Sequence, residues 1–486
     1  MEVKNIVCYS NYLNNQDAMA HLRIIGPFRQ AGINIINGWE KGKPQSLRVS
    51  DGDIVFIQRE FPAWFGDYQK IVEDARLMGK PIVFDLDDLL FFLPESHPDR
   101  KSQYFVPSLL PMYEALKEAD LVTVSTPKLK EVLSRYNQNV VVLPNYFDET
   151  LWQLRPPVLK PRGEILTIGF MGGNSHIPDI EYVLPVLQDL IKRYHGQIRL
   201  SFWGLQPPAA LLSLPQVVWT PHYSDVYKEF STFFQTQSAD IFIAPLVDNL
   251  FNRSKSPLKF FEYTALGTAC VLSRLETYTD VVTHGYNGLL ASSLDEWTDC
   301  LIQLIENGEL RLRLAYNAQS LIRKDWLLSQ NAFRWQEVFR NLSGEISPKP
   351  QDQDEIVHSA IIQLAEKFEE DQAVTAQVAQ KEQEVHSLRA QLEENEQEMQ
   401  SLKVQLEEEE NSVQELIAEK NRVEQDLQWF STQLAERSHT IDVLTNEKNE
   451  AQREAVSYAL STSWKITRPF RRIMGKFKKG RTAPHV

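Results

Sequence analysis

The sequence predicts an α/β protein with two tandem parallel-sheet domains, followed by a long α-helical coiled coil. Three observations lead to this prediction. Short runs rich in Val and Ile alternate with helical patterns over residues 5–143, the same alternation restarts near residue 165, and apolar heptads follow residue 381. The 486 residues suffice for two or three domains with cores of their own.

Five buried parallel strands are expected in each half, because each run is short, rich in β-branched residues and flanked by helical periodicity. In the first half the expected strands are residues 5–9, 53–57, 81–85, 121–125 and 140–143, with helices near 18–31 and 64–78. In the second half they are residues 165–170, 198–203, 217–220, 240–244 and 269–273, with helices near 180–194 and 331–342. Two such Rossmann-like domains leave a cleft between them, and ligands bind outside the carboxyl ends of the strands.

Changes in composition set the expected domain boundaries. The two Rossmann-like domains span residues 1–154 and 155–345, and the Pro- and Arg-bearing stretch 155–163 joins them. Residues 346–380 are a linker and helical lead-in, 381–454 a coiled coil, and 455–486 a basic amphipathic tail.

The net charge of −14 is spread unevenly along the chain. Residues 350–454 carry 26 acidic and 9 basic side chains, whereas residues 455–486 carry 8 basic and no acidic ones. Three cysteines without metal-ligand spacing indicate a reducing compartment, and neither a secretory signal nor a membrane-spanning run is visible. We therefore expect a cytoplasmic protein.

With Val385 at heptad position a, fifteen of the twenty a and d positions up to Ala451 are apolar. The polar positions are Asn395, Glu409, Lys420, Arg437 and Lys448. This pattern predicts a homo-oligomeric coiled coil over residues 381–454, with strand number and orientation left open.

In residues 464–481, apolar side chains are interleaved with Lys and Arg. Ile466, Phe470, Ile473 and Phe477 would share one helix face. Such a helix suits an anionic membrane surface, which would attach the protein peripherally to the inner face of the membrane. A disordered basic tail is the alternative. A nucleic-acid contact would rest on this tail alone, and the acidic body argues against one, so no nucleic-acid partner is expected.

The most informative segment is residues 252–290. Ser256 followed by Pro257 predicts a helix start, with Ser256 as the N-cap. Gly267 is expected to end that helix before the strand at 269–273, and Gly285 supplies a turn that needs positive φ.

Charged residues accompany that helix start. Lys255 and Lys259, together with backbone N–H groups at the helix start, would form an anion site suited to a diphosphate. Glu262 could accept hydrogen bonds from vicinal hydroxyls such as those of a ribose. An acidic residue within an otherwise apolar helical stretch favours a functional role over a purely structural one.

This segment resembles the donor-binding signature of retaining glycosyltransferases of the family-4 type, which have the two-domain GT-B fold. The matching residues are Lys259, Glu262, Tyr263, Ala265, Gly267, Gly285, Asn287 and Gly288. Residues 119–133, 140–152 and 168–176 resemble further segments of the same family, so that the likeness covers about residues 1–345.

The resemblance implies an acceptor-binding first domain and a second domain that binds a nucleotide diphosphosugar. The implied donor-binding residues are Gly172, Gly173, Asn174, Arg253, Lys255, Ser256, Lys259 and Glu262. It also implies hexosyl transfer with retention of the anomeric configuration, with no metal and no cofactor besides the donor substrate. The implied acceptor is a glycan or a lipid-linked molecule, in cell-surface polysaccharide synthesis.

The sequence departs from the family pattern at several positions. Ser254 stands where the family often has a first Glu. The Arg and Lys that usually follow the first strand of the second domain are also missing, and Arg253, Lys255 or Lys259 could substitute for them. A Gly-Gly acceptor loop is absent after the first strand, and Asp87 stands where a His is usual.

Asp85, Asp87 and Asp88 cluster at the end of one expected strand. We interpret Asp87 and Asp88 as catalytic residues that line the sugar site. Two other interpretations are a D-x-D metal site of the GT-A fold, against which the tandem domains argue, and N-capping of the next turn by Asp88. His97 and His176 are secondary candidates.

Two other functions remain open at this point. The departures fit a catalytically inactive glycosyltransferase-like scaffold whose coiled coil recruits partners. A sugar-nucleotide epimerase of the same fold would need neither the coiled coil nor the tail.

Overall fold

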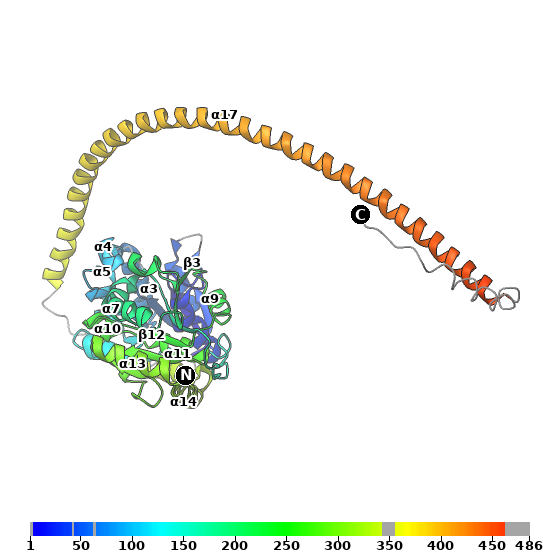
Figure 1. The fold of residues 1–486 in the computed structure, drawn as a ribbon. Helices are drawn as coiled ribbons and strands as arrows, with labels where there is room; N and C mark the ends of the chain where they lie inside the picture. Colours follow the sequence, from blue (N-terminus) through cyan, green and yellow to red (C-terminus); the bar gives the residue numbers. More distant parts are fainter. Residues whose placement is uncertain (1–2, 41–42, 62–64, 343–354, 462–486) are drawn as a thin grey trace. The chain divides into compact units, whose positions relative to one another are not determined.

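The computed structural model describes residues 3–40, 43–61, 65–342 and 355–461. The chain divides into two compact units, Met1–Asp352 and Gln353–Val486. The first unit contains two parallel sheets with their helices, and the second contains one long helix (Figure 1).

The first half of the first unit is a parallel six-stranded sheet with the order β2-β1-β5-β6-β7-β8. Its strands are β1 (Asn5–Tyr9), β2 (Asn34–Asn37), β5 (Ile54–Gln58), β6 (Ile82–Leu86), β7 (Leu121–Val124) and β8 (Val140–Val142), beside a short hairpin of β3 (Trp39–Glu40) and β4 (Lys43–Pro44). All five predicted strands are confirmed. The edge strand β2 was not predicted, because its sequence NIIN is short and bounded by Asn.

Helices connect these strands and cover the sheet. They are α1 (Ala18–Ala20), η1 (His21–Ile25), α2 (Gly26–Gln30), η2 (Ser46–Asp51), α3 (Phe65–Leu77), η3 (Leu90–Phe92), α4 (Pro98–Lys101), α5 (Val106–Glu118) and α6 (Pro127–Leu133). The predicted helix at 18–31 is continuous in the chain but passes through one π-helical turn at η1.

The second half has the sheet order β11-β10-β9-β12-β13-β14, again all parallel. This is the 3-2-1-4-5-6 strand order of the doubly wound dinucleotide-binding fold. Its strands are β9 (Leu166–Gly172), β10 (Ile198–Gly204), β11 (Val217–Pro221), β12 (Ile241–Ala244), β13 (Ala269–Ser273) and β14 (Leu289–Ala291). The five predicted strands are confirmed, and only the three-residue β14 was missed.

The helices of the second half lie between and after these strands. They are η4 (Asn174–His176), α7 (Ile177–Arg193), α8 (Ala209–Leu212), α9 (Tyr227–Phe234), α10 (Leu250–Arg253), α11 (Leu258–Ala265), α12 (Glu276–Thr279), α13 (Leu294–Glu306), α14 (Gly308–Leu321), η5 (Ile322–Trp326), α15 (Leu328–Asn331) and α16 (Phe333–Arg340).

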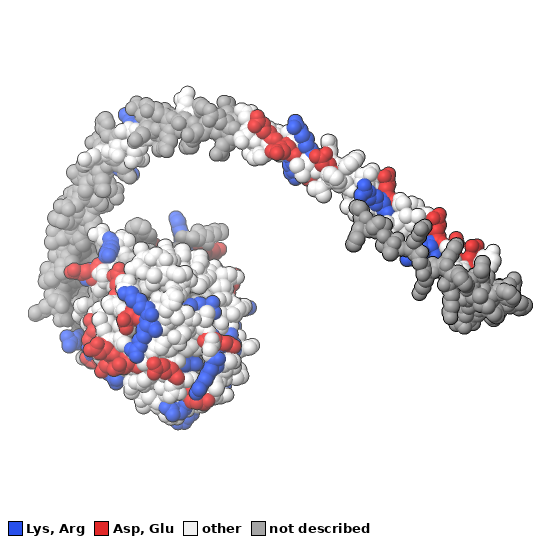
Figure 2. All heavy atoms as spheres, viewed as in Figure 1, with Lys and Arg blue, Asp and Glu red and all other residues white. Residues whose placement is uncertain are grey.

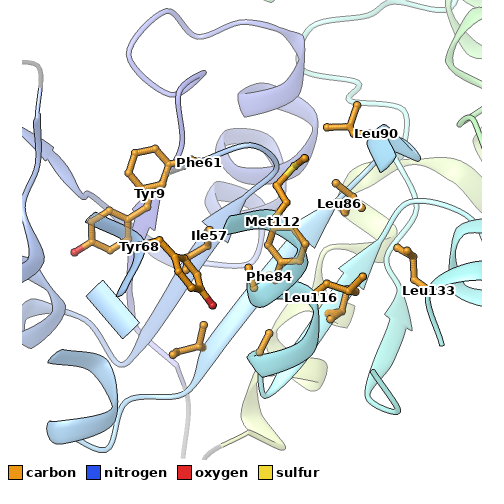
Figure 3. Close-up of a cluster of buried hydrophobic side chains, with 14 of the residues drawn as sticks. Tyr9, Ile57, Phe61, Tyr68, Phe84, Leu86, Leu90, Met112, Leu116 and Leu133 are labelled. Carbon is orange, nitrogen blue, oxygen red and sulfur yellow. The ribbon is translucent and has the colours of Figure 1, made fainter. Parts of the chain in front are cut away.

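Each sheet is buried against helices by large apolar side chains. Figure 3 shows the cluster in the first half, where strand residues such as Ile57 and Phe84 meet Tyr68 of α3 and Met112 and Leu116 of α5. The last helix of the unit, α16, packs back on the first half, because the Phe339 ring lies edge-on to the rings of Phe28 and Phe56. These contacts tie the two halves together.

The second unit is the 106-residue helix α17 (Glu355–Leu460), which confirms the predicted long helix. Over the part whose side chains are described, acidic and basic residues alternate along its surface (Figure 2). Leu427, Phe430 and Leu434 of the predicted apolar seam are exposed on the isolated helix. Pairing into a coiled coil stays a prediction, and the predicted membrane segment 464–481 lies outside the described residues.

Candidate functional site

A cavity of about 630 Å³ lies between the two halves of the first unit. It is formed where β1 of the first half and β9 and β10 of the second half end, as expected for ligand sites in parallel sheets. Its lining includes Asn11, Tyr12, Asn15, Asp17, Met19 and Tyr104 from the first half, and Met171, Gly172, Gly173, Trp203, Tyr227, Leu258, Lys259 and Glu262 from the second.

A smaller cavity of about 170 Å³ adjoins the first, with which it shares Met19, Leu258 and Lys259. Its lining also includes Asp87, Asp88, Asn145, His176, Lys255, Ser256 and Tyr278. The structure therefore brings eight of the ten predicted site residues to these two cavities, from segments that are far apart in the sequence.

Helix α11 carries two charged side chains that line the larger cavity, Lys259 and Glu262, at positions three residues apart on one helix face. The predicted N-cap is wrong: Pro257 occupies the cap position, and the buried Ser256 hydroxyl has no hydrogen-bond partner among the described residues. The helix ends as predicted, because Gly267 has φ +74°. A side chain there would meet the Arg155 carbonyl oxygen at 2.7 Å.

Glu262 lines the larger cavity and is only 7% exposed. Burial raises its pKa to about 7, which the nearby Lys259 ammonium and the Tyr227 hydroxyl oppose. The Tyr227 hydroxyl donates to Glu262 Oε1 over 3.5 Å and accepts a hydrogen bond from Trp152 Nε1. One carboxylate oxygen is thus held in place, and the other is available to a ligand hydroxyl.

The Lys259 ammonium lies over the end of β9. Burial lowers the pKa of Lys259 to about 8. The Glu262 carboxylate opposes this shift, and the positive charge of Lys255 adds to it. A Cβ at Gly172 would sit 2.9 Å from Phe170 Cζ and 3.2 Å from Lys259 Nζ, so a side chain at this position would crowd both residues. Lys255 lies with its Nζ 4.4 Å from the centre of the Phe251 ring. The two lysines place two positive charges beside the adjoining cavities, which an anion would neutralise.

Two predicted donor-binding residues lie elsewhere. The Arg253 guanidinium is paired with Asp248 and with Glu276 at 2.9 Å, and it is not among the residues that line either cavity. Asn174 is exposed at the start of η4 and lines neither cavity, whereas its neighbour Gly173 lines the larger one. Gly173 has open space where a Cβ would be.

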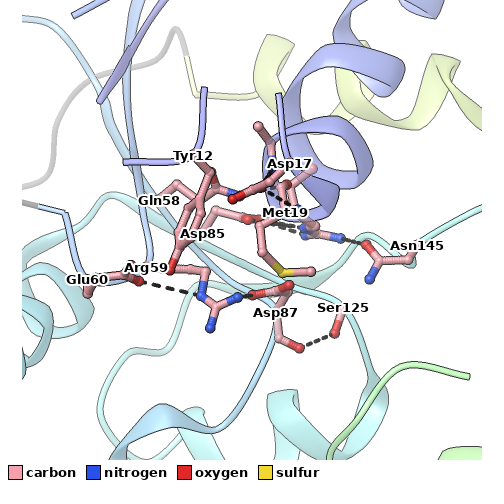
Figure 4. A network of polar contacts seen from close by, with 12 residues as sticks. Tyr12, Asp17, Met19, Gln58, Arg59, Glu60, Asp85, Asp87, Ser125 and Asn145 are labelled. Atoms are coloured by element: carbon pink, nitrogen blue, oxygen red, sulfur yellow. Dashed lines mark hydrogen bonds and ion pairs between the residues drawn. The ribbon is translucent and has the colours of Figure 1, made fainter. Parts of the chain in front are cut away.

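The three carboxylates after β6 have different environments. Asp85 is bound by the buried Arg23 guanidinium at 2.7 Å and by the Thr123 hydroxyl at 2.6 Å, which is a structural role. Asp87 lies 3.4 Å from the Arg59 guanidinium (Figure 4). Burial raises the pKa of Asp87 to about 6, against the effect of Arg59.

Asp88 faces the smaller cavity without a hydrogen-bond partner for its carboxylate among the described residues. It does not cap the next turn, because η3 has Leu89 at its N-cap and no side-chain cap. The N-capping interpretation of Asp88 is therefore wrong.

The two secondary histidines are held by acidic neighbours. His176 Nδ1 lies 2.7 Å from Asp179 Oδ2, and burial together with Lys259 and Lys255 holds the pKa of His176 well below its usual value. His97 caps α4, where its Nδ1 accepts the Asp99 backbone N–H. His176 lines the smaller cavity, whereas His97 lines neither.

Sequence reasoning missed several residues of the site. Arg59, Tyr227 and Asp17 approach it from loops and helices that carry no recognisable motif. Arg59 has φ +53°, an unusual backbone conformation for a residue with a side chain. The sequence feature that could have identified this position is the pair Arg59 and Glu60, which directly follows the buried strand β5.

Within the described residues, no group of three or more His, Cys, Asp or Glu side chains is placed to hold a metal ion. No described helix combines the length and apolar character that crossing a bilayer requires.

Comparisons with known proteins agree with this architecture. Residues 164–307 match the family model described as Glycosyl transferases group 1. No curated protein gives a significant match. Sucrose-phosphate synthase from Thermosynechococcus elongatus is similar in structure, with a TM-score of 0.51, 12% identity and coverage of 70% of this chain and 99% of that chain.

Two further solved structures cover the same share of this chain. HepE of Anabaena in complex with UDP-glucose has a TM-score of 0.47 and 13% identity, over 99% of that chain. A glycosyltransferase from Rickettsia africae has a TM-score of 0.46 and 12% identity, over 98% of that chain. Residues 164–307 thus match a glycosyl transferases group 1 model and lie within a GT-B fold of two Rossmann-like halves.

Proposed function

We propose that the protein is a retaining, hexosyl-type glycosyltransferase that moves a sugar from a nucleotide diphosphosugar to a glycan or lipid-linked acceptor. The group 1 domain and the GT-B fold support glycosyl transfer. The observation that carries the proposal is the pair of Lys259 and Glu262, one helical turn apart and facing the cavity between the halves.

The donor would bind mainly to the second half. Glu262 offers a free carboxylate oxygen for the ribose hydroxyls, and Lys255 and Lys259 offer positive charge for the diphosphate. The Gly172–Gly173 turn lets the leaving group approach the backbone closely. The unpartnered Ser256 hydroxyl supplies a further hydrogen-bond donor at the rim of the smaller cavity.

Transfer breaks the bond between the sugar C1 and the diphosphate oxygen and forms a bond from C1 to the acceptor hydroxyl oxygen. The two lysines stabilise the negative charge that develops on the departing diphosphate, so this proposal needs no metal. The acceptor proton passes to the departing phosphate oxygen on the same face, which retains the configuration at C1. Asp87 and Asp88 would orient the hydroxyls of the reacting sugars.

The test is nucleoside diphosphate release by the full chain from a panel of UDP-, GDP- and dTDP-sugars with mixed saccharide acceptors. We expect release from one nucleotide class, at least tenfold lower kcat/KM in Glu262→Gln, and a product with the donor's anomeric configuration by NMR. A folded wild-type chain that consumes none of these donors would contradict the proposal, and inverted product would contradict retention.

We also propose that α17 forms a homo-oligomer through residues 381–454 and that the protein acts in cell-surface polysaccharide synthesis. Exposed Leu427, Phe430 and Leu434 on the described part of the helix support self-association, because isolated helices seldom leave such a row uncovered. Attachment of residues 464–481 to the inner membrane surface remains a proposal from the sequence. Flotation with vesicles of anionic and of neutral lipid tests it, with binding expected to the anionic vesicles only.

One observation favours an inactive scaffold as the second candidate. Ser254, which stands where the family often has a Glu, is completely buried, and its hydroxyl donates to the Leu250 carbonyl. Its own carbonyl accepts from the Thr126 hydroxyl across the two halves, so position 254 ties the halves together and does not face the cavity. A scaffold would bind partners through α17 while releasing no nucleotide in the assay above.

A further inference from the structure

We propose that the acceptor is an uncharged saccharide whose ring lies on the first-half wall of the larger cavity, formed by Asn11, Asn15, Asp17 and Tyr104. This inference rests on the proposed function and narrows its acceptor from a glycan or lipid-linked molecule to a neutral sugar ring at the reacting end. Two independent features of the wall support it, its charge and its hydrogen-bonding groups.

The cations of the two cavities come from one half only. The second half supplies Lys255 and Lys259 as well as the acidic residues Asp225 and Glu262, whereas the first half supplies Asp17, Asp87 and Asp88. Among the described residues that line these cavities from the first half, none is Lys or Arg. A donor diphosphate would bind near the two lysines. An acceptor phosphate or carboxylate on the first-half wall would be repelled by the negatively charged aspartates, and no lysine or arginine of that wall would neutralise its charge.

The first-half cation that contacts the cavity-lining Tyr12 is already occupied. Arg59 is buried behind the wall, 3.4 Å from Asp87 and 3.6 Å from Glu60 (Figure 4). Its guanidinium also covers the Tyr12 ring at 5.2 Å. An anionic acceptor would have to compete with two buried carboxylates for this one cation.

The wall offers the groups that bind sugar hydroxyls. The Asn11 and Asn15 side-chain amides have no hydrogen-bond partner among the described residues. Asp17 Oδ1 accepts the backbone N–H groups of Met19 and Ala20, which fixes the carboxylate and leaves Oδ2 for a ligand. Amides donate and accept, and a carboxylate accepts, which suits a ring that carries several hydroxyls.

An aromatic face completes the wall. The Tyr104 ring is 58% exposed and is held edge-on against Phe105, with ring centres 4.9 Å apart. An exposed aromatic ring beside polar groups suits the apolar C–H face of a sugar. The loop that carries Asn15 is itself anchored, because the Tyr227 backbone N–H donates to the Gln16 carbonyl.

The experiment is a glycan array of neutral, phosphorylated, sulfated and uronic-acid saccharides, probed with the full chain in saturating nucleoside diphosphate. We expect the wild-type chain to bind glycans that end in a neutral ring. The Asn15→Ala and Asp17→Ala chains should bind the same glycans at least tenfold more weakly. Asn14→Ala is the matched control, because Asn14 binds the Asn37 amide and does not line the cavity. Its retention should equal that of the wild type.

Retention mainly on anionic glycans, no retention on any glycan, or unchanged retention by both wall variants would overturn the inference. Calorimetry of donor binding by the same proteins separates this failure from failure of the proposed function. If only the acceptor inference is wrong, all variants still bind the nucleotide sugar; if the proposed function is wrong, the wild type does not bind it.

A separate observation concerns the partner of α17. We further infer that two copies of this helix pair in antiparallel orientation. Four of the predicted seam positions carry charge: Glu409, Lys420, Arg437 and Lys448. A parallel, in-register pair would set each of these positions opposite the same residue of the second copy, which repels at all four.

An antiparallel register removes these like-charge pairs along the middle of the seam. Placing position 409 opposite position 420 of the second copy pairs opposite charges twice by symmetry. The same register sets positions 402, 399 and 388 opposite 427, 430 and 441, all of which carry apolar residues. Charge complementarity at 409 and 420 and apolar matching at the other three pairs therefore favour the same alignment, which leaves one like-charge pair near the end of the seam, Lys448 opposite Lys381.

Disulfide trapping in the full chain tests the orientation, because the three native cysteines are buried. An equimolar mixture of Leu402→Cys and Leu427→Cys chains should form crossed disulfide dimers, whereas Leu434→Cys alone should form few. Efficient Leu434→Cys dimers would show a parallel pair, and a monomer by light scattering would exclude pairing. Either result would overturn the inference.

Discussion

Replacing Lys259 by Met removes one of the two cations proposed to hold the donor diphosphate. A hydrogen bond to a charged group contributes about 1.5–3 kcal/mol. Because about 1.4 kcal/mol corresponds to a factor of ten, the Kd for the nucleotide sugar should rise by about 10- to 100-fold. Binding should weaken without disappearing, since Lys255 remains beside the smaller cavity.

The same substitution should not destabilise the fold. Among the described residues, the Lys259 ammonium has no ion pair or hydrogen bond. Burial lowers its pKa, which means that the desolvated charge destabilises the folded protein when no donor is bound. Methionine keeps a chain of similar length and carries no charge. We therefore expect a Tm equal to or above that of the wild type.

Calorimetry and thermal unfolding of the full chain measure both effects. Lys160→Met is the matched control, because Lys160 Nζ is paired with Asp240 at 2.8 Å and lines neither cavity. It should lower Tm and leave donor binding unchanged. The reasoning is refuted if Lys259→Met binds the donor as the wild type does, or if its loss of binding is matched by a loss of folded protein.

Three further predictions concern the same cleft. Donor affinity should rise with pH as the Glu262 carboxyl ionises near its raised pKa of about 7, and fall as Lys259 loses its proton above about 8; calorimetry from pH 5.5 to 9.5 should show a maximum between these values, and a flat profile would contradict both roles. Gly172→Ala should reduce transfer at least tenfold because its Cβ would sit 2.9 Å from Phe170 Cζ, 3.0 Å from His176 Cδ2 and 3.2 Å from Lys259 Nζ, whereas Gly173→Ala has open space and should reduce it little; equal effects would exclude the proposed close approach. Asp88→Asn should lower kcat at least tenfold with donor Kd unchanged, and an unchanged kcat would remove Asp88 from the site.

Regular elements of the fold were predictable because their signals are local. The run at residues 5–9 is a continuous apolar strand sequence, and β1 spans Asn5–Tyr9 in the structure. Strands of three or four residues, such as β14 and β2, give too few positions for such a pattern. Short sequences of this kind become strands because a neighbouring strand pairs with them.

The candidate site was predictable only where its residues share one segment. Lys259 and Glu262 lie three residues apart, and the sequence predicted both for the donor site on one helix. The Tyr227 hydroxyl that donates to Glu262, and the Trp152 N–H that donates to this hydroxyl, come from distant parts of the chain. No local sequence pattern predicts these hydrogen bonds. Arg253 lies in the same segment, but the sequence does not reveal that its guanidinium pairs with Asp248 and Glu276.

Donor binding is the most direct test of the proposed function. Calorimetric titration of the full chain with UDP-, GDP- and dTDP-sugars, in parallel with Glu262→Ala, would measure it. The proposal predicts saturable binding of one nucleotide class at one site per chain, weakened at least tenfold in Glu262→Ala, whose fold should persist. A folded wild-type chain that binds none of these donors, or a Glu262→Ala variant that binds equally well, would contradict it.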